Sequence, residues 1–167
     1  MTQLSLFPQK KITDIENRWQ LFVDGASRNN PGLAGAGVFV KKNNKPVATK
    51  AFFLNNKTNN EAEYLSLILG LLVVENAQFG EKDFLEIISD SELLVNQILG
   101  KYRVKKPELQ KFFNLAKKIL NKINYNIKHT LRENNKEADK LANEAIDKKS
   151  KISEDLLSQL DAYGITI

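Results

Sequence analysis

Four acidic residues stand where a polar side chain is unexpected. Asp24 directly follows the apolar run Leu21–Val23, and Asp90 directly follows the apolar segment FLEIIS. Glu63 and Asp139 each lie early in a stretch with helical spacing, beside the apolar positions that predict its buried face. A carboxylate in such a place is costly unless it is paired, hydrogen-bonded or bound to a cation.

Each acid has a simple structural explanation as well. Asp24 could cap a turn, and Asp90 could cap the helix that follows it. Glu63 and Asp139 could complement helix dipoles. Gathered at one edge of a sheet, however, the carboxylates would repel one another strongly unless cations were present. Oxygen ligands without histidine or cysteine suit Mg²⁺ or Mn²⁺, and two such ions can stabilise the attacking and leaving oxygens of a phosphodiester cleavage.

The elements that must position these acids follow from the spacing of apolar residues. Strands are predicted at 19–24, 34–42, 47–54, 84–89 and 125–131, and helices at 59–77, 91–99, 107–122, 135–147 and within 153–160. Tight turns join the first three strands into an antiparallel meander, and helical crossovers make the last two parallel to the first. The order predicts an α/β domain with a mixed five-stranded sheet flanked by helices, and Asp24 and Asp90 at one sheet edge. The small residues of AGAGVFVKK should let another backbone approach closely.

The composition limits the class of protein. The chain has 167 residues, enough for one domain with a sizeable core, and no cysteine. Disulfides, thiolate metal sites and a cysteine nucleophile are therefore excluded. No export signal or membrane-spanning stretch is recognisable, so we expect a cytoplasmic location. The net charge of +5 and the pI of about 9.3 favour a polyanionic partner.

Four segments together resemble a known enzyme family. VDGASRNNPG, TNNEAEY, SDSELLV and NKEADKLA are similar, in order, to the signature segments of type 1 ribonuclease H, and the resemblance covers residues 18–147. It implies the ribonuclease H-like fold, with three antiparallel and two parallel strands, and hydrolysis of the RNA strand of RNA–DNA hybrids by a monomer. The resemblance also implies the catalytic and metal-binding set Asp24, Glu63, Asp90 and Asp139, with two Mg²⁺ ions and Mn²⁺ as an alternative. Glu63, rather than Glu61, matches the family's acid.

The same resemblance implies how the hybrid is held. Four residues match positions that contact it: Ser27, Asn30, Asn59 and Asn60. Backbone and side-chain amides at these positions would read 2′-hydroxyls, which distinguish RNA from DNA. Thr58 would help to hold a DNA phosphate. Turn and helix-cap chemistry is the alternative explanation for all five residues.

The segment before the last acid departs from the best-known members of the family, which have a flexible loop with a histidine there. HTLRENNKEAD is too short for that loop, and Arg132 and Glu133 occupy the connection, as in a subgroup with the pattern Arg-Glu-x-Asn. His129 alternates with Ile127 and Leu131, so we expect it to face the core and assign it no catalytic role.

The family's long basic handle is also shortened, to GKYRVKKPEL. Tyr102, Arg103, Lys105 and Lys106 are the residues expected to bind the DNA strand, through charge and one aromatic face. A solvated helix surface is the alternative explanation for these lysines.

The chain is predicted to comprise a tail at 1–17, the ribonuclease H domain at 18–148 and a C-terminal extension at 149–167. The tail contains QLSLF, that is Gln3, Leu4, Ser5, Leu6 and Phe7, which resembles the peptide by which bacterial replication and repair proteins dock on the DNA sliding clamp. Such peptides place Leu and Phe in an apolar pocket. The alternative is that these apolar residues fold back onto the domain.

Two other functions are compatible with such a fold. Related folds cut DNA junctions or integrate DNA, but the DGASRNNPG and TNNEAE segments argue against a changed substrate. An inactive hybrid-binding module is the third hypothesis, and retention of all four acids argues against it, because a binder has little reason to tolerate clustered carboxylates.

Overall fold

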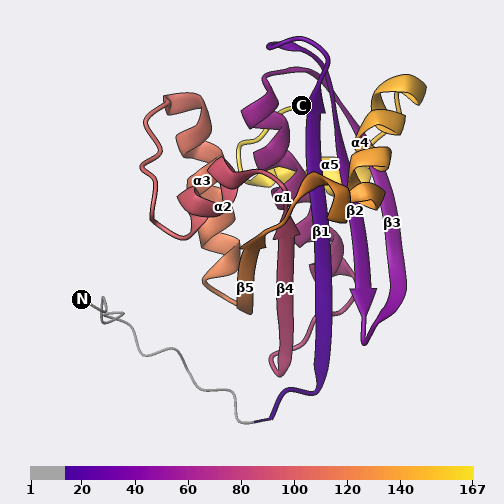
Figure 1. The fold of residues 1–167 in the computed structure, drawn as a ribbon, viewed down its shortest axis with the longest axis vertical. Helices are drawn as coiled ribbons and strands as arrows, with labels where there is room; N and C mark the ends of the chain where they lie inside the picture. Colours follow the sequence, from indigo (N-terminus) through magenta and orange to yellow (C-terminus); the bar gives the residue numbers. More distant parts are fainter. Residues whose placement is uncertain (1–13) are drawn as a thin grey trace.

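The computed structural model describes residues 14–167, which form a five-stranded sheet with helices on both faces (Figure 1). The strands are β1 (Asn17–Ser27), β2 (Gly32–Lys42), β3 (Lys45–Lys57), β4 (Asp83–Ser89) and β5 (Asn124–His129). The helices are α1 (Asn59–Asn76), α2 (Glu92–Ile98), α3 (Pro107–Leu120), α4 (Lys136–Lys148) and α5 (Glu154–Ala162), with a 3-10 turn, η1, at Arg132–Asn134. The sheet order β3-β2-β1-β4-β5 confirms the predicted mixed sheet.

β1, β2 and β3 form the predicted antiparallel meander. Asn43 and Asn44, with φ of 50° and 65°, make the turn between β2 and β3, because asparagine tolerates the left-handed region. β4 and β5 are each reached through helices and run parallel to β1 and β4 respectively. The C-terminal end of β4 therefore lies beside β1 at Val23.

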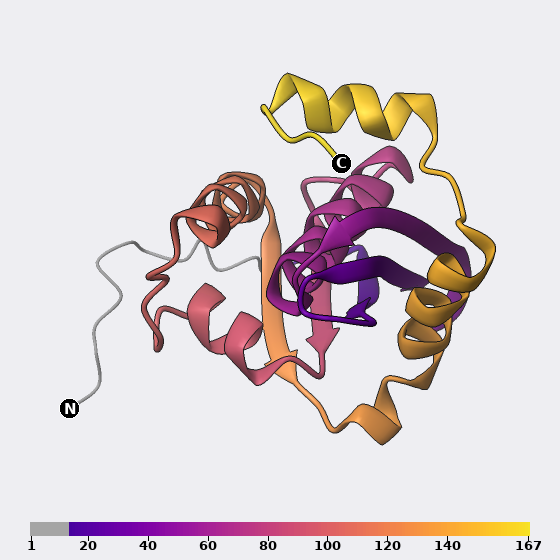
Figure 2. The same cartoon turned by 90° about the horizontal axis from the view of Figure 1, so that it is seen from above.

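α1 lies between the sheet and an outer layer of helices (Figure 2). Every residue from Ala62 to Val74 is buried, as expected of a helix that is apolar on almost all sides. Asn76 and Gln159 exchange two side-chain hydrogen bonds, of 3.0 and 3.1 Å, that join α1 to α5. Leu160 of α5 is fully buried, so the segment predicted as a C-terminal extension contributes to the core.

α4 packs on the opposite face of the sheet, over β1, β2 and β3. A Cβ atom at Gly37 would overlap the carbonyl oxygen of Ala138, so this glycine lets the α4 backbone lie directly on β2. That close approach is the one expected from the small residues of the strand. Below α4 in the view of Figure 1, no helix within residues 14–167 covers this face of β1 and β4.

At the other end of the sheet, Asp83 joins the beginnings of β1 and β4. Its carboxylate accepts hydrogen bonds from Trp19 Nε1 at 2.9 Å, Asn17 Nδ2 at 2.8 Å and the Gly80 backbone at 3.0 Å. Burial opposes ionisation of this group, but the hydrogen bonds prevail and hold the pKa of Asp83 below its usual value. Asp83 thus stays charged and anchors the two central strands.

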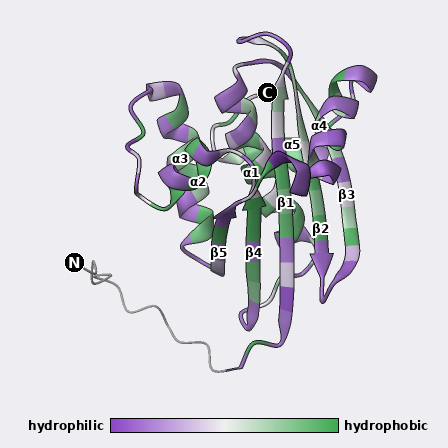
Figure 3. Ribbon diagram, viewed as in Figure 1, coloured by the Kyte–Doolittle hydropathy of each residue, from purple (hydrophilic) through white to green (hydrophobic). Residues whose placement is uncertain are grey.

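Apolar residues gather on β4 and on the inner faces of the helices that cover the sheet (Figure 3). Among the described residues, no helix combines the length and the apolar character needed to cross a membrane. The QLSLF peptide lies outside the described residues.

Candidate active site

Asp24 and Asp90 lie at the same edge of the sheet. β1 and β4 run parallel with Val23 opposite Ser89, so the next residue of each segment stands beside the other. Ser91, not Asp90, caps α2, because its hydroxyl accepts a backbone hydrogen bond of 3.2 Å from the first turn. Helix capping therefore does not account for the Asp90 carboxylate.

Glu63 reaches this edge from the beginning of α1. Thr58 caps the helix, and Glu61 completes the capping box by accepting a hydrogen bond of 3.0 Å from the Thr58 backbone. Gly25 lies against the α1 backbone at Glu63, where a Cβ atom would overlap it. This contact brings α1 onto β1 beside the first carboxylate.

The carboxylates of Asp24, Glu63 and Asp90 converge. One oxygen from each lies within 4.8 Å of the others, and Asp24 and Glu63 are only 5% and 7% exposed. Burial, followed by the charges of Asp90 and Asp139, raises the pKa of Asp24 to about 8. Burial, followed by the charges of Asp24 and Asp90, also raises the pKa of Glu63 well above its usual value. Proton binding therefore relieves the repulsion when no cation is bound.

The cluster fits a divalent cation. The Oε2 atom of Glu63 is buried and has no hydrogen-bond partner among the described residues. A buried carboxylate oxygen without a donor is costly, and a cation would satisfy it. All the converging donors are hard oxygens, which Mg²⁺ and Mn²⁺ prefer.

Asp139 lines the same cleft from the first turns of α4. Its carboxylate forms an ion pair of 3.1 Å with Arg132, and this hydrogen bond and charge raise the pKa of the Arg132 guanidinium. The cleft has a volume of about 410 Å³, and all four predicted acids and Arg132 line it. A role for Arg132 could not be predicted from the sequence, because one arginine in a short connection has no periodic pattern.

Asn135 fixes the beginning of α4 to β1. Asn135 is the N-cap residue of α4, but its side chain makes no capping bond and instead donates a hydrogen bond of 2.9 Å to the Val23 carbonyl. Asn135 is 1% exposed, and Val23 immediately precedes Asp24. This side chain therefore links the segments that carry the first and last acids.

The residues predicted to contact a hybrid surround the cleft. Ser27 and Asn59 line it, and Asn60 is half-buried on the same turn of α1. The Asn30 Oδ1 atom accepts a hydrogen bond of 3.0 Å from the Asn59 backbone, and Ser27 donates one of 2.8 Å to the Lys57 carbonyl. Local hydrogen bonds thus hold the two turns together, and Thr58 acts as a helix cap.

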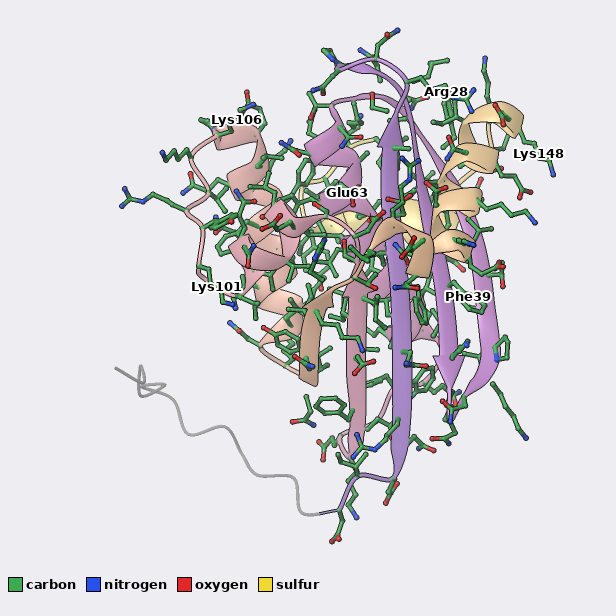
Figure 4. All side chains as sticks on the ribbon, viewed as in Figure 1. Arg28, Phe39, Glu63, Lys101, Lys106 and Lys148 are labelled. Carbon is green, nitrogen blue, oxygen red and sulfur yellow. The ribbon has the colours of Figure 1, made fainter. Side chains whose placement is uncertain are left out.

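The basic segment between α2 and α3 lies apart from the cleft. Its predicted contact residues, Tyr102, Arg103, Lys105 and Lys106, are all exposed. Lys101 and Lys106 lie on one side of Glu63, and Arg28 lies on the other (Figure 4). Tyr64 of α1 donates a buried hydrogen bond of 2.6 Å to Gln97, whose amide lies 3.4 Å from the Arg103 carbonyl, so the segment is attached to the core.

The expectation that His129 faces the core is wrong. Ile127 is buried as predicted, but His129 is exposed, and its Nε2 atom lies 3.2 Å from the Asp90 carbonyl oxygen. His129 is the last residue of β5, an edge strand. The alternation of apolar residues continues to this position, but no helix within residues 14–167 packs over it there.

The family model described as reverse transcriptase-like matches residues 22–145, a span that includes all four acids of the cleft. The chain is 38% identical over 136 residues to Ribonuclease HI of Halobacterium salinarum, covering 80% of this chain and 67% of that protein. It is 36% identical over 129 residues to a bifunctional protein of Mycobacterium tuberculosis, of which it spans only 34%.

Solved structures of RNase H1 proteins are also similar to this chain. The RNase H1 of Halobacterium salinarum superposes with a TM-score of 0.74 at 34% identity, covering 78% of this chain and 98% of that one. LC11-RNase H1 in complex with an RNA/DNA hybrid superposes with a TM-score of 0.72 at 36% identity, covering 80% and 99%. The chain therefore belongs to the ribonuclease H family.

Proposed function

We propose that this protein is a metal-dependent endoribonuclease that hydrolyses the RNA strand of RNA–DNA hybrids. The convergence of Asp24, Glu63 and Asp90 within 4.8 Å, in a polar cleft, is the observation that carries the proposal. The relative solved with an RNA/DNA hybrid, at 36% identity, supports the choice of substrate.

The four acids of the cleft are the proposed metal ligands. Two Mg²⁺ or Mn²⁺ ions would be held by Asp24, Glu63, Asp90 and Asp139, and they would supply an activated water and a positive charge near the departing oxygen. Gly25 and Gly37 allow the close packing that holds the acid-bearing helices against the sheet. The ion pair of 3.1 Å with Arg132 orients the Asp139 carboxylate at the rim of the cleft.

The turns beside the cleft would select the substrate. Ser27, Asn30, Asn59 and Asn60 are proposed to contact the hybrid, with amide groups that read the 2′-hydroxyls of the RNA strand. Thr58 is proposed to contact a DNA phosphate. The exposed side chains of Tyr102, Arg103, Lys105 and Lys106 would bind the DNA strand farther from the cleft.

One assay tests the activity. Labelled RNA–DNA hybrid, double-stranded RNA and double-stranded DNA are each incubated with the protein in Mg²⁺, Mn²⁺ or EDTA. Cleavage of the RNA strand of the hybrid in either metal, with none in EDTA, is the expected result. Binding of the hybrid without cleavage in any metal would instead identify an inactive binding module.

The proposed partner beyond the hybrid is a bacterial DNA sliding clamp, bound through residues 3–7. The sequence QLSLF alone supports this proposal, and a clamp-bound nuclease would meet RNA primers at high effective concentration. Deletion of residues 1–8 should abolish binding to purified clamp and leave the cleavage of free hybrid unchanged. Equal clamp affinity of the full-length and shortened proteins would refute it. Action as a monomer in the cytoplasm stays a prediction.

A further inference from the structure

The face of the sheet below α4 carries an unusual combination of rings and cations. Phe22 of β1 and Phe39 of β2 are register partners, and their ring centroids lie 5.7 Å apart. Lys41 Nζ lies 5.8 and 5.7 Å from the centroids of these two rings. On the next strand, Phe84 lies beneath Arg18, whose Cζ atom is 5.7 Å from the ring centroid.

These side chains share one face because strand residues alternate. Arg18, Phe22 and Asp24 all have the same parity on β1, so their side chains project from the same side of the sheet. All three phenylalanines are half-buried rather than enclosed. Phe22 lies two residues before Asp24 of the carboxylate cleft, about 7 Å away along the strand.

The charge on this face is mainly positive. Lys128 is paired with Glu86 at 3.1 Å, whereas Arg18 and Lys41 form no ion pair within residues 14–167. A second copy of the chain, placed against this face about a twofold axis, would bring like charges together, which is unfavourable. A polyanion would instead find unpaired cations and flat rings together, as on the sheet surfaces that bind single-stranded nucleic acid.

We propose that the uncovered sheet face formed by Arg18, Phe22, Phe39, Lys41 and Phe84 binds a single-stranded nucleic acid segment that continues from the hybrid. The bases contact the phenylalanine rings, and the phosphates pair with Arg18 and Lys41. This surface lies outside the carboxylate cleft, so the binding of nucleic acid to it can be measured in EDTA, without cleavage.

Affinity measurements in EDTA test the proposal, with fluorescently labelled oligothymidine and two hybrids as probes. One hybrid is blunt, and the other carries a single-stranded tail of about 10 nucleotides. The wild-type protein should bind oligothymidine and should bind the tailed hybrid more tightly than the blunt one. In Phe39→Leu and Lys41→Gln, which keep most of the side-chain volume, the ratio of tailed to blunt affinity should fall by about 5-fold or more.

Phe79→Leu combined with Lys122→Gln is the matched control, because this aromatic and this basic residue both line the cavity beside α1 and α3, outside the proposed surface. The control should keep the wild-type ratio. Melting temperatures show whether each variant is folded. If Phe39→Leu is unstable, Lys41→Gln still tests the proposal, because it changes a side chain on the strand surface.

Equal wild-type affinity for tailed and blunt hybrids, or an equal loss on both in the variants, would overturn the proposal. A dimer that Phe39→Leu dissociates in ultracentrifugation would also overturn it. Failure of the proposed nuclease function is seen separately, as absent cleavage of blunt hybrid by the wild-type protein in Mg²⁺.

Discussion

The Asp24 carboxylate is buried beside two others. It should therefore favour metal binding and, by charge repulsion, lower the stability of the metal-free protein. Replacing Asp24 or Asp90 by Asn should reduce hybrid cleavage by more than the roughly 100-fold that loss of an outer-shell partner costs. Without metal, the melting temperature should stay level or rise, by about 2–4 °C for each kcal/mol of repulsion removed. Cleavage in Mg²⁺ and thermal unfolding in EDTA measure the two effects.

Glu137→Gln is the matched control for these variants, since Glu137 is an exposed acid two residues before Asp139. It makes the same change of charge outside the cleft and should keep both activity and melting temperature. Near-normal cleavage by Asp24→Asn would show that this carboxylate is not a metal ligand.

The raised pKa of Asp24 also predicts how stability depends on pH. The pKa rises from its ordinary 3.8 to about 8, so the folded protein binds more protons than the unfolded chain between those values. The free energy of unfolding in EDTA should therefore fall as the pH rises through this window, and the raised pKa of Glu63 adds to the trend. Urea unfolding midpoints measure it, and Asp24→Asn should flatten the curve. A midpoint that rises with pH would contradict the shift.

Residue type and position in the sequence were enough to single out the four acids, because an acid after an apolar strand or beside a buried helix face is recognisable without a structure. Arg132 and Asn135 could not be found in this way. Their partners, Asp139 and the Val23 carbonyl, are known only once α4 is placed on β1. A lone arginine or asparagine in a connection looks like ordinary turn chemistry.

The two central strands depend on one buried carboxylate at the end away from the cleft. Asp83→Ala would leave the Trp19 indole N–H buried without a partner, which should cost about 1–3 kcal/mol of stability. Because the pKa of Asp83 is lowered by folding, its contribution should be present above the unfolded pKa of 3.8 and be lost as pH falls through the folded value. Urea unfolding at neutral and acidic pH measures this loss, and an equal effect of the substitution at both would contradict it.

The position of α4 depends on the absence of a side chain at Gly37. In Gly37→Ala, the added methyl group would overlap the Ala138 carbonyl, so we expect a loss of about 1–3 kcal/mol in stability and weaker cleavage as α4 moves. Gly80→Ala is the control, because the nearest atom to its new Cβ would be Asp83 Oδ2, at 3.7 Å. Unfolding and hybrid-cleavage assays on both variants measure the difference. Equal stability of the two would show that α4 can shift without cost.

The strands and helices were predicted within a few residues, because their apolar periods are long and clear. The prediction was weakest where burial depends on neighbours that are distant in sequence. His129 continues a strand pattern beyond the helices that cover it, and the α5 segment is too short for its pattern to show that Leu160 reaches the core. Both outcomes depend on tertiary packing, which local propensity does not determine.

The basic residues of the whole protein are spread over several surfaces, and only binding measurements separate their roles. Changing Lys105 and Lys106 together to Ala should weaken hybrid binding and reduce the salt slope by about one unit for each lost phosphate contact. Affinities in EDTA between about 50 and 200 mM salt measure the slope.

The control for this variant is Lys122→Ala with Lys151→Ala, which removes the same charge at exposed positions outside the cleft and the basic segment. An equal reduction of the salt slope in the two double variants would show that the reduction comes from the lost net charge and not from lost phosphate contacts.

β1 enters the sheet at the end opposite the carboxylates (Figure 1). Asn17 and Asp24 are separated by roughly 23 Å of extended strand, at about 3.3 Å per residue. A bead or sensor surface coupled ahead of Asn17 would therefore hold the protein with its cleft turned towards the solution. Long duplexes could then reach the cleft without steric obstruction by the support, which makes this end the preferred attachment point for immobilised-enzyme measurements.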